Sequence, residues 1–492
     1  MLFWINGALT NFCLSYYLQK KINSDFFAII DSYDKPKAFF KNQSLVKFQE
    51  TWFYHDHFQN LGKPDLDYLS DFDKKYDINL WELAINERIF YRFNNVYKFS
   101  SDEILSILEH ESKLFENILT KINPDFLIME EPALHQEELL YRMCKKNGTK
   151  TLLLTQPNMQ RCMISENPRK FDMEIDLGQI QSSHRSFDEL RSYRNSIASS
   201  SKIKEHINSF KVSNIELLKS SLKFLSSENQ HIKTHYTHRG RTKLDVLKDE
   251  STKKLAKKRR SSFMENNLET EIEHNEKFIY FPLGVDEERN LLIAAPYYTN
   301  QIEVIRHIVK SLPIGYVLYV KENPAQNIRY WRDIDEYKEI MDIPNVRLFH
   351  PDVSAESLFQ KCSLVITIGG SSGLDAAFYQ KPSIVFTDLG YIVLPSVSKL
   401  DNITDLPRIV RESLKKEVSN DDLDKYLTIV HENTFDFNIL EFGDSYNDFF
   451  YHGGHYLSVE ILESKMKEFL DNNQEILDNL ASEFEKKIKE NF

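Results

Sequence analysis

The stretch VITIGGSSGLDAAFYQKPSIVF, residues 365–386, decides the fold class. It opens with the apolar run Val365–Ile368, which is typical of a buried strand, and passes through a Gly-Gly-Ser-Ser-Gly turn into a helix-like segment. We expect the helix to end near Lys381-Pro382, where a second apolar run, Ser383–Phe386, begins. Two strands joined by one short helix form a right-handed βαβ unit, so the sequence predicts a parallel sheet.

The Gly/Ser turn, residues 369–373, has the features of an anion site. Glycine permits backbone angles that other residues resist, and the whole chain holds only 14 glycines. Ser371 or Ser372 can cap the following helix, whose N terminus then offers N–H groups and the positive end of its dipole. The same pattern also suits a capped helix without a ligand. The turn is neither a Walker A loop nor a GxGxxG loop.

Alternation of strand-like and helix-like segments predicts two α/β domains. In the first part we expect strands at Leu2–Ile5, Phe26–Ile30, Phe126–Met129 and Thr151–Leu154, and helices at 8–21, 101–120 (capped by Ser101) and 136–146. In the second part we expect strands at Phe278–Phe281, Tyr316–Val320 and Val346–Phe349, and helices at 299–311, 354–361 and 457–490. The expected domains are 1–184, a helical charged insertion or linker at 185–275, a second domain at 276–410, and a helical tail at 411–492 that can pack back on the first domain.

Composition narrows the class of protein. Hydrophobic residues make up 41% and charged residues 28%, as in soluble globular proteins, and the net charge of −12 gives no general argument for nucleic acid. The four cysteines are scattered without a CxxC pair, which is typical of a reducing compartment. The first positive charge, Lys20, follows the apolar N-terminal stretch, and no run reaches the roughly 18 apolar residues of a membrane span. We therefore expect a cytoplasmic protein.

Polar residues follow two further strands of the second domain. Lys321, Glu322 and Asn323 come at the end of one strand, and His350 and Asp352 come at the end of the next. In an open α/β sheet, ligands bind outside the carboxyl ends of the strands. Three consecutive strand ends therefore carry groups suited to one ligand, although exposed strand ends are also polar without any ligand.

The segment from about 278 to 395 resembles the carboxyl-terminal half of the capsular polysaccharide biosynthesis proteins. These are GT-B glycosyltransferases that include the Kdo transferases of capsule assembly. The matching pieces are FIYFPLGVDEERN, LPIGYVLYVKENP, NVRLFHPDVSAESLFQKCSLVITIGGSSGLDAAFYQKPSIVF and the Tyr391 that follows. The resemblance implies a GT-B-like fold of two Rossmann-like domains, with a nucleotide-sugar donor held mainly by the second domain and no cofactor besides this donor.

The resemblance also implies a donor site. Lys321 and Glu322 match a Lys-Glu-His-Pro segment of the family, but Asn323 stands in place of its histidine. Asparagine can donate a hydrogen bond to phosphate, yet it cannot be protonated. Asp375 stands where an acidic residue often touches the ribose or the sugar. The expected donor-binding residues are Lys321, Glu322, Asn323, His350, Gly370, Ser371, Ser372, Gly373 and Asp375.

The segment DFLIMEEPALHQEE, residues 125–138, offers candidates for a catalytic base. Sugar transfer with inversion needs a base near the acceptor hydroxyl, and a carboxylate or a histidine can supply it. Glu130 or Glu131, directly after a strand of the first domain, is the first choice, and His135 is the second. Acidic residues at the start of a helix also favour its dipole without any catalytic role.

Two other patterns have weaker functional readings. The pairs Asp65/Asp67 and Asp71/Asp73 have the DxD spacing of metal ligands, but they lie in an acidic loop and not after an apolar strand, so we expect a metal-independent enzyme. The basic cluster Lys253–Arg260, with Arg239 and Arg241 upstream, can attract anionic lipid head groups or form a solvated helix face.

The leading hypothesis is a glycosyltransferase of surface polysaccharide or glycolipid synthesis at the inner face of the cell membrane. Its partners would be a nucleotide sugar, with a CMP-activated acidic sugar favoured by the resemblance, and a glycan or lipid-linked acceptor, but no nucleic acid. A sugar-nucleotide epimerase of the same layout is an alternative within the enzymes. A non-catalytic binding or scaffold protein is the alternative from another class, because Asn323 replaces the family's histidine.

Overall fold

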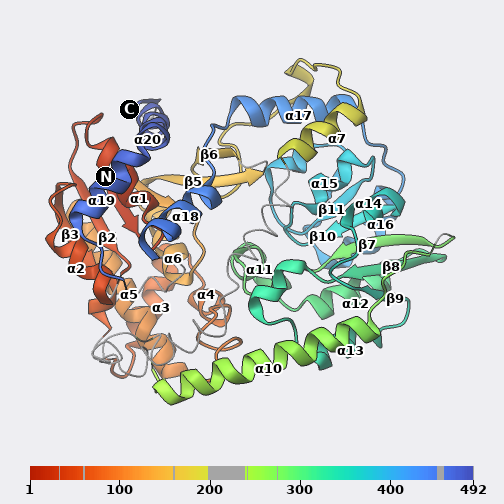
Figure 1. Ribbon diagram of the computed structural model, residues 1–492, viewed down its shortest axis with the longest axis horizontal. Helices are drawn as coiled ribbons and strands as arrows, with labels where there is room; N and C mark the ends of the chain where they lie inside the picture. Colours follow the sequence, from red (N-terminus) through yellow and green to blue (C-terminus); the bar gives the residue numbers. More distant parts are fainter. Residues whose placement is uncertain are drawn as a thin grey trace. The chain divides into compact units, whose positions relative to one another are not determined.

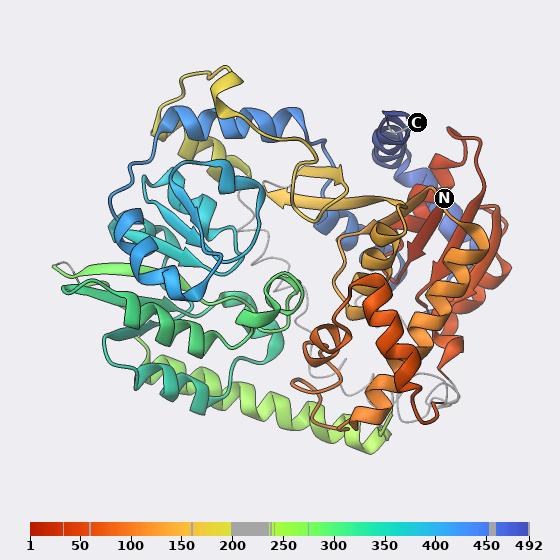
Figure 2. The ribbon, with the colours of Figure 1, turned by 180° about the vertical axis from the view of Figure 1, so that it is seen from behind.

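The computed structural model describes residues 1–32, 34–58, 61–158, 161–197, 236, 239–240, 242–273, 275–451 and 459–490. The chain divides into two compact units, each with one sheet at its centre (Figures 1 and 2). Unit 1 comprises Met1–Asp172, Asn208–Asp245 and Thr434–Phe492, and unit 2 comprises Met173–Ile207 and Val246–Asn433. The segment 185–275, expected to be a separate insertion, is thus shared between the two units.

Sheet 1, in unit 1, has six strands in the order β3-β2-β1-β4-β5-β6. Its strands are β1 Leu2–Ile5, β2 Phe26–Ile30, β3 Phe48–Phe53, β4 Phe126–Glu130, β5 Lys150–Asn158 and β6 Arg161–Ser165. All neighbours are parallel except β5 and β6, which are antiparallel. This is the strand order of a Rossmann fold with an antiparallel edge strand.

Both faces of sheet 1 are covered by helices. The helices of unit 1 are α1 Thr10–Leu18, α2 Asp34–Asn42, α3 Leu66–Tyr76, α4 Leu80–Ile85, α5 Ser101–Ile122, α6 His135–Lys146, α18 Ile439–Tyr446, α19 Glu463–Asn472 and α20 Gln474–Glu490, with the short turns η1 Tyr54–His57 and η8 Asn447–Tyr451. Alternate residues of β1 point to opposite faces, so Phe3 packs with α1 and α20, and Trp4 packs with α5 and α6. Figure 1 shows α20 beside α1.

Sheet 2, in unit 2, has six parallel strands in the order β12-β11-β10-β7-β8-β9. Its strands are β7 Lys277–Pro282, β8 Tyr316–Lys321, β9 Val346–Phe349, β10 Leu364–Thr367, β11 Ser383–Val385 and β12 Val397–Lys399. In the register of the central strands, Val365 of β10 lies opposite Tyr280 of β7 and Ser383 of β11. The order is again that of a Rossmann fold, so the predicted βαβ unit and the predicted GT-B-like architecture are confirmed.

Helices also cover both faces of sheet 2. They are η2 Leu177–Gln179, α7 Phe187–Ile197, α10 Lys243–Asn267, α11 Arg289–Leu292, η4 Pro296–Tyr298, α12 Gln301–Ser311, η5 Pro324–Arg329, α13 Ile334–Met341, α14 Ala355–Lys361, α15 Ser372–Phe378, η6 Gly390–Val393, η7 Ile403–Asp405, α16 Leu406–Ser413 and α17 Asn420–Glu432. The core on one face joins the sheet to α10, α12, α13 and α16. On the other face, stacked aromatic rings such as Phe278 on Tyr319, 3.9 Å between centroids, fill the interior.

Three expected details differ from the structure. The helix predicted at 457–490 is two helices, α19 and α20, because Asn473 ends the first one. The cap of α5 is Ser100 and not Ser101, and Ser100 forms a capping box with Glu103. Strand β3, whose sequence FQETWF is half polar, was not predicted from its pattern.

Candidate functional site

The Gly/Ser turn lies at the topological switch point of sheet 2. Strands β7 and β10 are neighbours, and the order continues from them in opposite directions, to β8 and β9 on one side and to β11 and β12 on the other. The loops after β7 and β10, residues 283–288 and 368–371, therefore meet the edge at which open α/β sheets bind ligands. The sequence predicts a role for the second loop and gives the first loop none.

Close packing is the reason for glycine in the turn. The Tyr391 hydroxyl donates a 2.5 Å hydrogen bond to the carbonyl oxygen of Gly370, and a Cβ atom on Gly373 would lie 2.6 Å from that hydroxyl. A Cβ atom on Gly369 would lie 2.9 Å from Thr387 Oγ1. None of these three glycines has a positive φ, so the expectation of unusual backbone angles is wrong. The turn is instead held tightly against the Tyr391 ring.

The two serines lie at the start of α15. Ser371 is exposed and occupies the N-cap position, but its side chain makes no capping hydrogen bond. Its Oγ atom lies 3.5 Å from Asp375 Oδ2, so the predicted cap by Ser371 is wrong. Ser372 is half-buried and is the first residue of the helix. The structure thus leaves Ser371 at the surface of the turn, where its hydroxyl can meet a ligand.

Asp375 forms an ion pair that the sequence does not reveal. Arg194 of α7 lies with its Nε atom 2.9 Å from Asp375 Oδ1, although the two residues are 181 positions apart. The side chains are 22% and 23% exposed. The pair places a guanidinium beside the first turn of α15, next to Ser371.

The end of β8 places the three predicted residues in different surroundings. Lys321 is 5% exposed, and its Nζ atom lies 3.4 Å from the carbonyl oxygen of Glu322. Glu322 is fully buried, and its Oε2 atom accepts hydrogen bonds from Arg332 Nε at 2.9 Å and from the Tyr337 hydroxyl at 2.8 Å. Asn323 caps η5, because its Oδ1 atom accepts a backbone N–H of that turn at 3.0 Å. Its amide N–H₂ group is the part that can donate to a phosphate.

Arg332 is the centre of a buried network at the switch point. It pairs with both Glu322 and Asp286, and it donates a 2.5 Å hydrogen bond to the carbonyl oxygen of Gly284. Gln301 at the start of α12 donates to Asp286 Oδ1 at 2.9 Å. The network joins the loop after β7 to the end of β8 and so fixes both. The sequence gives no role to either residue: Asp286 lies in the stretch FIYFPLGVDEERN, which carries only the family resemblance, and Arg332 lies in no motif.

His350 follows β9, which is the edge strand beyond β8. Its side chain is 15% exposed, and its Nδ1 atom accepts the Asp352 backbone N–H at 3.2 Å. Because Nδ1 is the acceptor, Nε2 carries the proton in the neutral ring and can donate it to a ligand.

Sheet 1 has a switch point of its own between β1 and β4. Glu130 is the last residue of β4, and the loop after β1 leads into Leu9, the N-cap residue of α1. Leu9 is buried and has a φ of 59°, a left-handed conformation that costs a non-glycine residue roughly 1–3 kcal/mol. Such strained residues cluster at functional sites. The sequence predicts Glu130 but gives no sign of the strained loop beside it.

The carboxyl group of Glu130 has the character of a general base. Its Oε1 atom is buried and has no hydrogen-bond partner among the described residues. Burial raises the pKa of Glu130, and a hydrogen bond from Thr10 offsets part of that rise. A carboxylate of raised pKa accepts a proton more readily than an ordinary one.

Glu131 is less suited to this role than Glu130. Arg169 Nε lies 3.0 Å from its Oε1 atom and 3.1 Å from its Oε2 atom, and the Glu131 side chain is only 13% exposed. The guanidinium occupies both carboxylate oxygens, so this side chain is less available to an acceptor hydroxyl.

His135 cannot act as the base predicted from its position. Its Nδ1 atom lies 2.7 Å from Glu87 Oε2, and its Nε2 atom lies 2.9 Å from Glu111 Oε1. Burial lowers the pKa of His135, but the two carboxylates outweigh it and raise this pKa to about 10. The ring is therefore an imidazolium at neutral pH and has no site for a proton. The hydroxyls of Tyr54 and Tyr236, 3.0 Å apart, close the cluster.

The two DxD pairs have structural partners. Asp65 caps α3 through the Tyr68 backbone N–H at 3.0 Å, and Asp73 accepts the Leu80 backbone N–H at 3.0 Å. Over the described ranges, no group of three or more His, Cys, Asp and Glu side chains is arranged to hold a metal ion. The four cysteines all lie in those ranges, buried and without disulfides.

The basic cluster Lys253–Arg260 lies on α10 and is partly engaged inside unit 2. Arg260 pairs with Asp333 and donates to two carbonyl oxygens, and Lys253 pairs with Asp249 at 2.6 Å. The exposed cations of the cluster are Lys254, Lys258 and Arg259.

Of the two arginines upstream of the cluster, Arg239 pairs with Glu103 at 2.6 Å, and Arg241 lies outside the described residues. No helix in the described part of the chain is long and apolar enough to cross a membrane.

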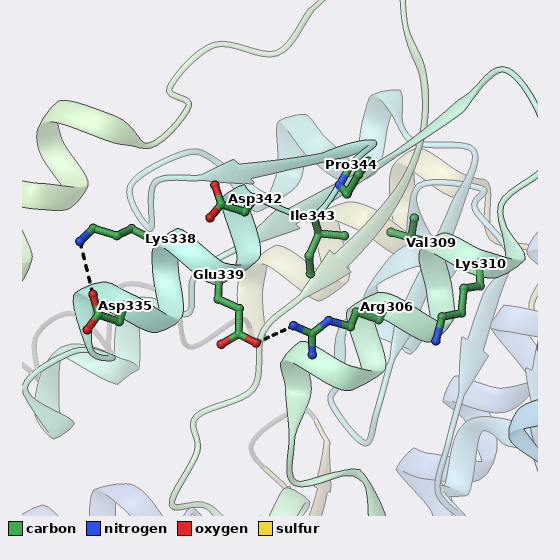
Figure 3. Close-up of a pocket in the computed structure, with 9 residues that line it drawn as sticks. All are labelled: Arg306, Val309, Lys310, Asp335, Lys338, Glu339, Asp342, Ile343 and Pro344. Carbon is green, nitrogen blue, oxygen red and sulfur yellow. Dashed lines mark hydrogen bonds and ion pairs between the residues drawn. The ribbon is translucent and has the colours of Figure 1, made fainter.

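A hollow of about 540 Å³ lies between α12 and α13 of unit 2 (Figure 3). The ion pair of Arg306 with Glu339, at 2.5 Å, joins the two helices, and the pair of Lys338 with Asp335, at 3.3 Å, lies within α13. It is lined by residues of α12 and α13 and by the turn 342–344 before β9, and by none of the loops that follow the strands, so it is separate from the switch point.

Comparisons with known proteins agree with the motifs of unit 2. No curated protein matches the chain in sequence. Solved structures of low identity do match. One is the UDP-GlcNAc 2-epimerase of Methanocaldococcus jannaschii in complex with UDP-GlcNAc and UDP, with 14% identity, coverage of 88% of this chain and 99% of that chain, and a TM-score of 0.24. Another is KpsC of Thermosulfurimonas dismutans, a beta Kdo 2,7 transferase, with 11% identity, coverage of 75% of this chain and 96% of that chain, and a TM-score of 0.30. These similarities are too weak to bear on the activity of this chain.

The family model described as capsule polysaccharide biosynthesis protein matches residues 184–395. The matched region is less than half of the chain, and it contains α7 with Arg194, the end of β8 and the whole Gly/Ser turn. The resemblance to the capsule polysaccharide biosynthesis proteins that the sequence predicts is therefore confirmed over residues 184–395.

Proposed function

We propose that the protein is a glycosyltransferase of surface polysaccharide or glycolipid synthesis, which moves a sugar from a nucleotide-sugar donor to a glycan or lipid-linked acceptor. One observation carries the proposal: the region that matches the capsule polysaccharide biosynthesis family contains a Rossmann switch point lined by hydroxyl, amide and cationic groups. Among donors, a CMP-activated acidic sugar is proposed from the family resemblance.

The donor phosphates are proposed to lie on the Gly/Ser turn. Ser371 and Ser372 offer hydroxyl donors there, and the start of α15 adds backbone N–H groups. Lys321 and Arg194 supply positive charge, which stabilises the phosphate that leaves with the nucleotide. The Asn323 amide can donate one more hydrogen bond but cannot supply a proton.

The roles of Glu322 and Asp375 are proposed to be indirect. Glu322 has no exposed surface, so it supports the site through Arg332 and through the backbone N–H of Asn323 at 2.6 Å. Asp375 holds Arg194 in place through its Oδ1 atom, so only its Oδ2 atom is left to contact the donor.

Glu130 is proposed as the base. It would take the proton of the acceptor hydroxyl, whose oxygen then forms a bond to the anomeric carbon of the sugar. The bond between that carbon and the donor phosphate breaks, and its electron pair stays on the phosphate. The half-buried carboxylate of Glu130, at the end of β4, is the group on which the proton would arrive.

A thermal-shift series with CMP, UDP, GDP and their sugars tests the donor site. A ligand that binds only the folded protein raises the melting temperature, so one nucleotide series should stabilise the protein and the others should not. We expect the CMP series to do so. Absence of stabilisation by every nucleotide would contradict the proposal.

Turnover of the stabilising nucleotide sugar then separates the enzyme classes. A glycosyltransferase releases nucleotide faster when membrane extract supplies the acceptor. Formation of an isomeric nucleotide sugar without any acceptor would indicate an epimerase, and binding without turnover would indicate a non-catalytic protein.

A further inference from the structure

The segment Leu80–Lys98 of unit 1 exposes large apolar side chains. Trp81 is 44% exposed, Ile85 is 50% exposed and Tyr91 is 67% exposed. Trp81 and Ile85 are four residues apart on α4, so they share one face of that helix. Single exposed apolar residues are common on proteins, but three within one short segment mark a contact surface.

The backbone that follows α4 is tightly folded, which keeps Tyr91 near the end of that helix. Consecutive turns follow α4, with hydrogen bonds from Glu87 N to Ala84 O at 3.1 Å, from Phe90 N to Glu87 O at 3.4 Å and from Phe93 N to Arg88 O at 3.2 Å. Tyr91 is therefore held close to the end of α4 and does not belong to an extended loop.

The exposed charges of the segment are positive. Its only acidic residues are Glu82 and Glu87. Glu82 pairs with Arg142 at 3.2 Å, and Glu87 is buried against His135. Arg92 and Lys98 are exposed. Although the net charge of the chain is −12, the exposed charged side chains within this segment are both cations.

We propose that Leu80–Lys98 docks unit 1 onto an anionic lipid bilayer. Trp and Tyr prefer the boundary between the head groups and the acyl chains, and Lys and Arg are attracted by anionic head groups. Ile85 adds an aliphatic side chain that gains from contact with lipid and offers no hydrogen bond to a sugar, so a bilayer suits the surface better than a glycan. This proposal is independent of the reaction assigned to the protein.

The docking segment adjoins the strand end that carries Glu130. Arg88 donates a 2.9 Å hydrogen bond to the carbonyl oxygen of Ala133, three residues beyond Glu130. A bilayer held by Trp81 and Tyr91 would therefore lie near the loop after β4, which suits an acceptor that is anchored in lipid.

Vesicle binding of the full chain tests the proposal directly. All four tryptophans lie in the described ranges, and Trp81 alone among them is exposed, because Trp4 is 1% exposed, Trp331 is 9% exposed and Trp52 is half-buried. Brominated phosphatidylcholine vesicles that contain phosphatidylglycerol should quench the tryptophan fluorescence, and vesicles without phosphatidylglycerol should do so far less. The Trp81→Phe variant should still bind the anionic vesicles but lose the quenching. Unquenched fluorescence of the wild type on anionic vesicles would overturn the proposal.

Variants then locate the surface. The combined change Trp81→Gln, Ile85→Gln and Tyr91→Ser should lower the partition onto anionic vesicles at least tenfold, and Arg92→Gln or Lys98→Gln should lower it roughly fivefold each. The matched control, Tyr297→Ser with Ile314→Gln, removes two side chains of unit 2 that are 78% and 103% exposed, and it should leave partition unchanged.

A second control removes the exposed cations of α10. Lys254→Gln with Lys258→Gln should leave the partition onto anionic vesicles unchanged within about twofold. If this variant lost binding while the triple variant of Trp81, Ile85 and Tyr91 bound fully, the proposal would be overturned in favour of α10. If the triple variant bound vesicles as tightly as the wild type but bound soluble glycan more weakly, the surface would be a sugar-binding surface and not a lipid-binding one.

Discussion

Ser371 and Ser372 are the residues on which the donor site can be tested most directly. A hydrogen bond to a charged group contributes roughly 1.5–3 kcal/mol, so Ser371→Ala with Ser372→Ala should weaken nucleotide binding tenfold or more for each bond lost. Isothermal titration with the stabilising nucleotide measures this. Ser354→Ala is the matched control, because Ser354 caps α14 in the same unit and should affect stability but not affinity. Unchanged affinity in the double variant would remove the phosphate role of the turn.

Glu130 separates chemistry from binding. Glu130→Gln keeps the shape of the side chain but removes the basic oxygen, so turnover should fall by roughly 10²–10⁴ while donor affinity stays the same. Because burial raises the pKa of Glu130, wild-type turnover should rise with pH through a midpoint above the ordinary range of a glutamate. Glu131→Gln is the comparison, and it should cost only a few-fold. Loss of donor binding in Glu130→Gln would show that Glu130 shapes the site instead.

His135 links the stability of unit 1 to pH. Its folded-state pKa of about 10 lies above the ordinary 6.5, so the ion pairs with Glu87 and Glu111 stabilise the fold fully below pH 6.5, and this contribution is lost as the pH rises through 10. His135→Gln leaves two buried carboxylates without their cation, which should cost about 3–5 kcal/mol at pH 6.5. Denaturant unfolding at pH 6.5 and pH 10 should show this difference shrinking at the higher pH. An equal difference at both values would contradict the charged state of His135.

At the scale of the elements, the Arg332 network decides whether the switch point of sheet 2 keeps its shape. Arg332→Met leaves Glu322 and Asp286 buried and unpaired, so we expect a loss of about 3–5 kcal/mol of stability together with loss of nucleotide binding. Arg306→Met is the control, since Arg306 pairs with Glu339 at the surface and should cost less than about 1 kcal/mol. Full nucleotide affinity in Arg332→Met would mean that the donor site does not depend on the loop after β7.

The elements also show which parts of the structure a sequence can predict. Strands β1, β2 and β9 begin and end at the predicted residues. For β1 and β2 the reason is that buried strands of a parallel sheet are continuous apolar runs. Strand β3 lies at an edge and is half-buried, and its three consecutive polar residues, Gln49–Thr51, break the apolar pattern that would reveal it. The Gly/Ser turn was found because its features are local. The pair of Arg194 with Asp375 joins residues far apart in the chain, and only the fold brings them together.

At the scale of the whole molecule, the two units repeat one arrangement. Both sheets have the Rossmann order, and in both the polar residues of interest follow the strands at the switch point. Alternation of elements predicted two such domains, and the helical tail expected at 411–492 does pack on the first one, from residue 434 onward, but the sequence did not predict that residues 173–207 belong to unit 2. Membership of this kind depends on side-chain packing between distant segments, which local patterns do not record.

The C-terminal helices are therefore expected to be essential to unit 1 alone. Helices α19 and α20 contribute large buried side chains to the core around α1, among them Met466, Phe469, Leu477, Leu480 and Phe484. Each such side chain contributes roughly 1.5–3 kcal/mol, and a domain is stable by only about 5–15 kcal/mol, so deletion of residues 463–492 should unfold unit 1. Calorimetry should then show the loss of one transition, while the nucleotide that binds unit 2 still raises the remaining one. If nucleotide stabilisation disappeared with the deletion, the donor site would depend on unit 1, and the assignment of donor binding to unit 2 alone would be wrong.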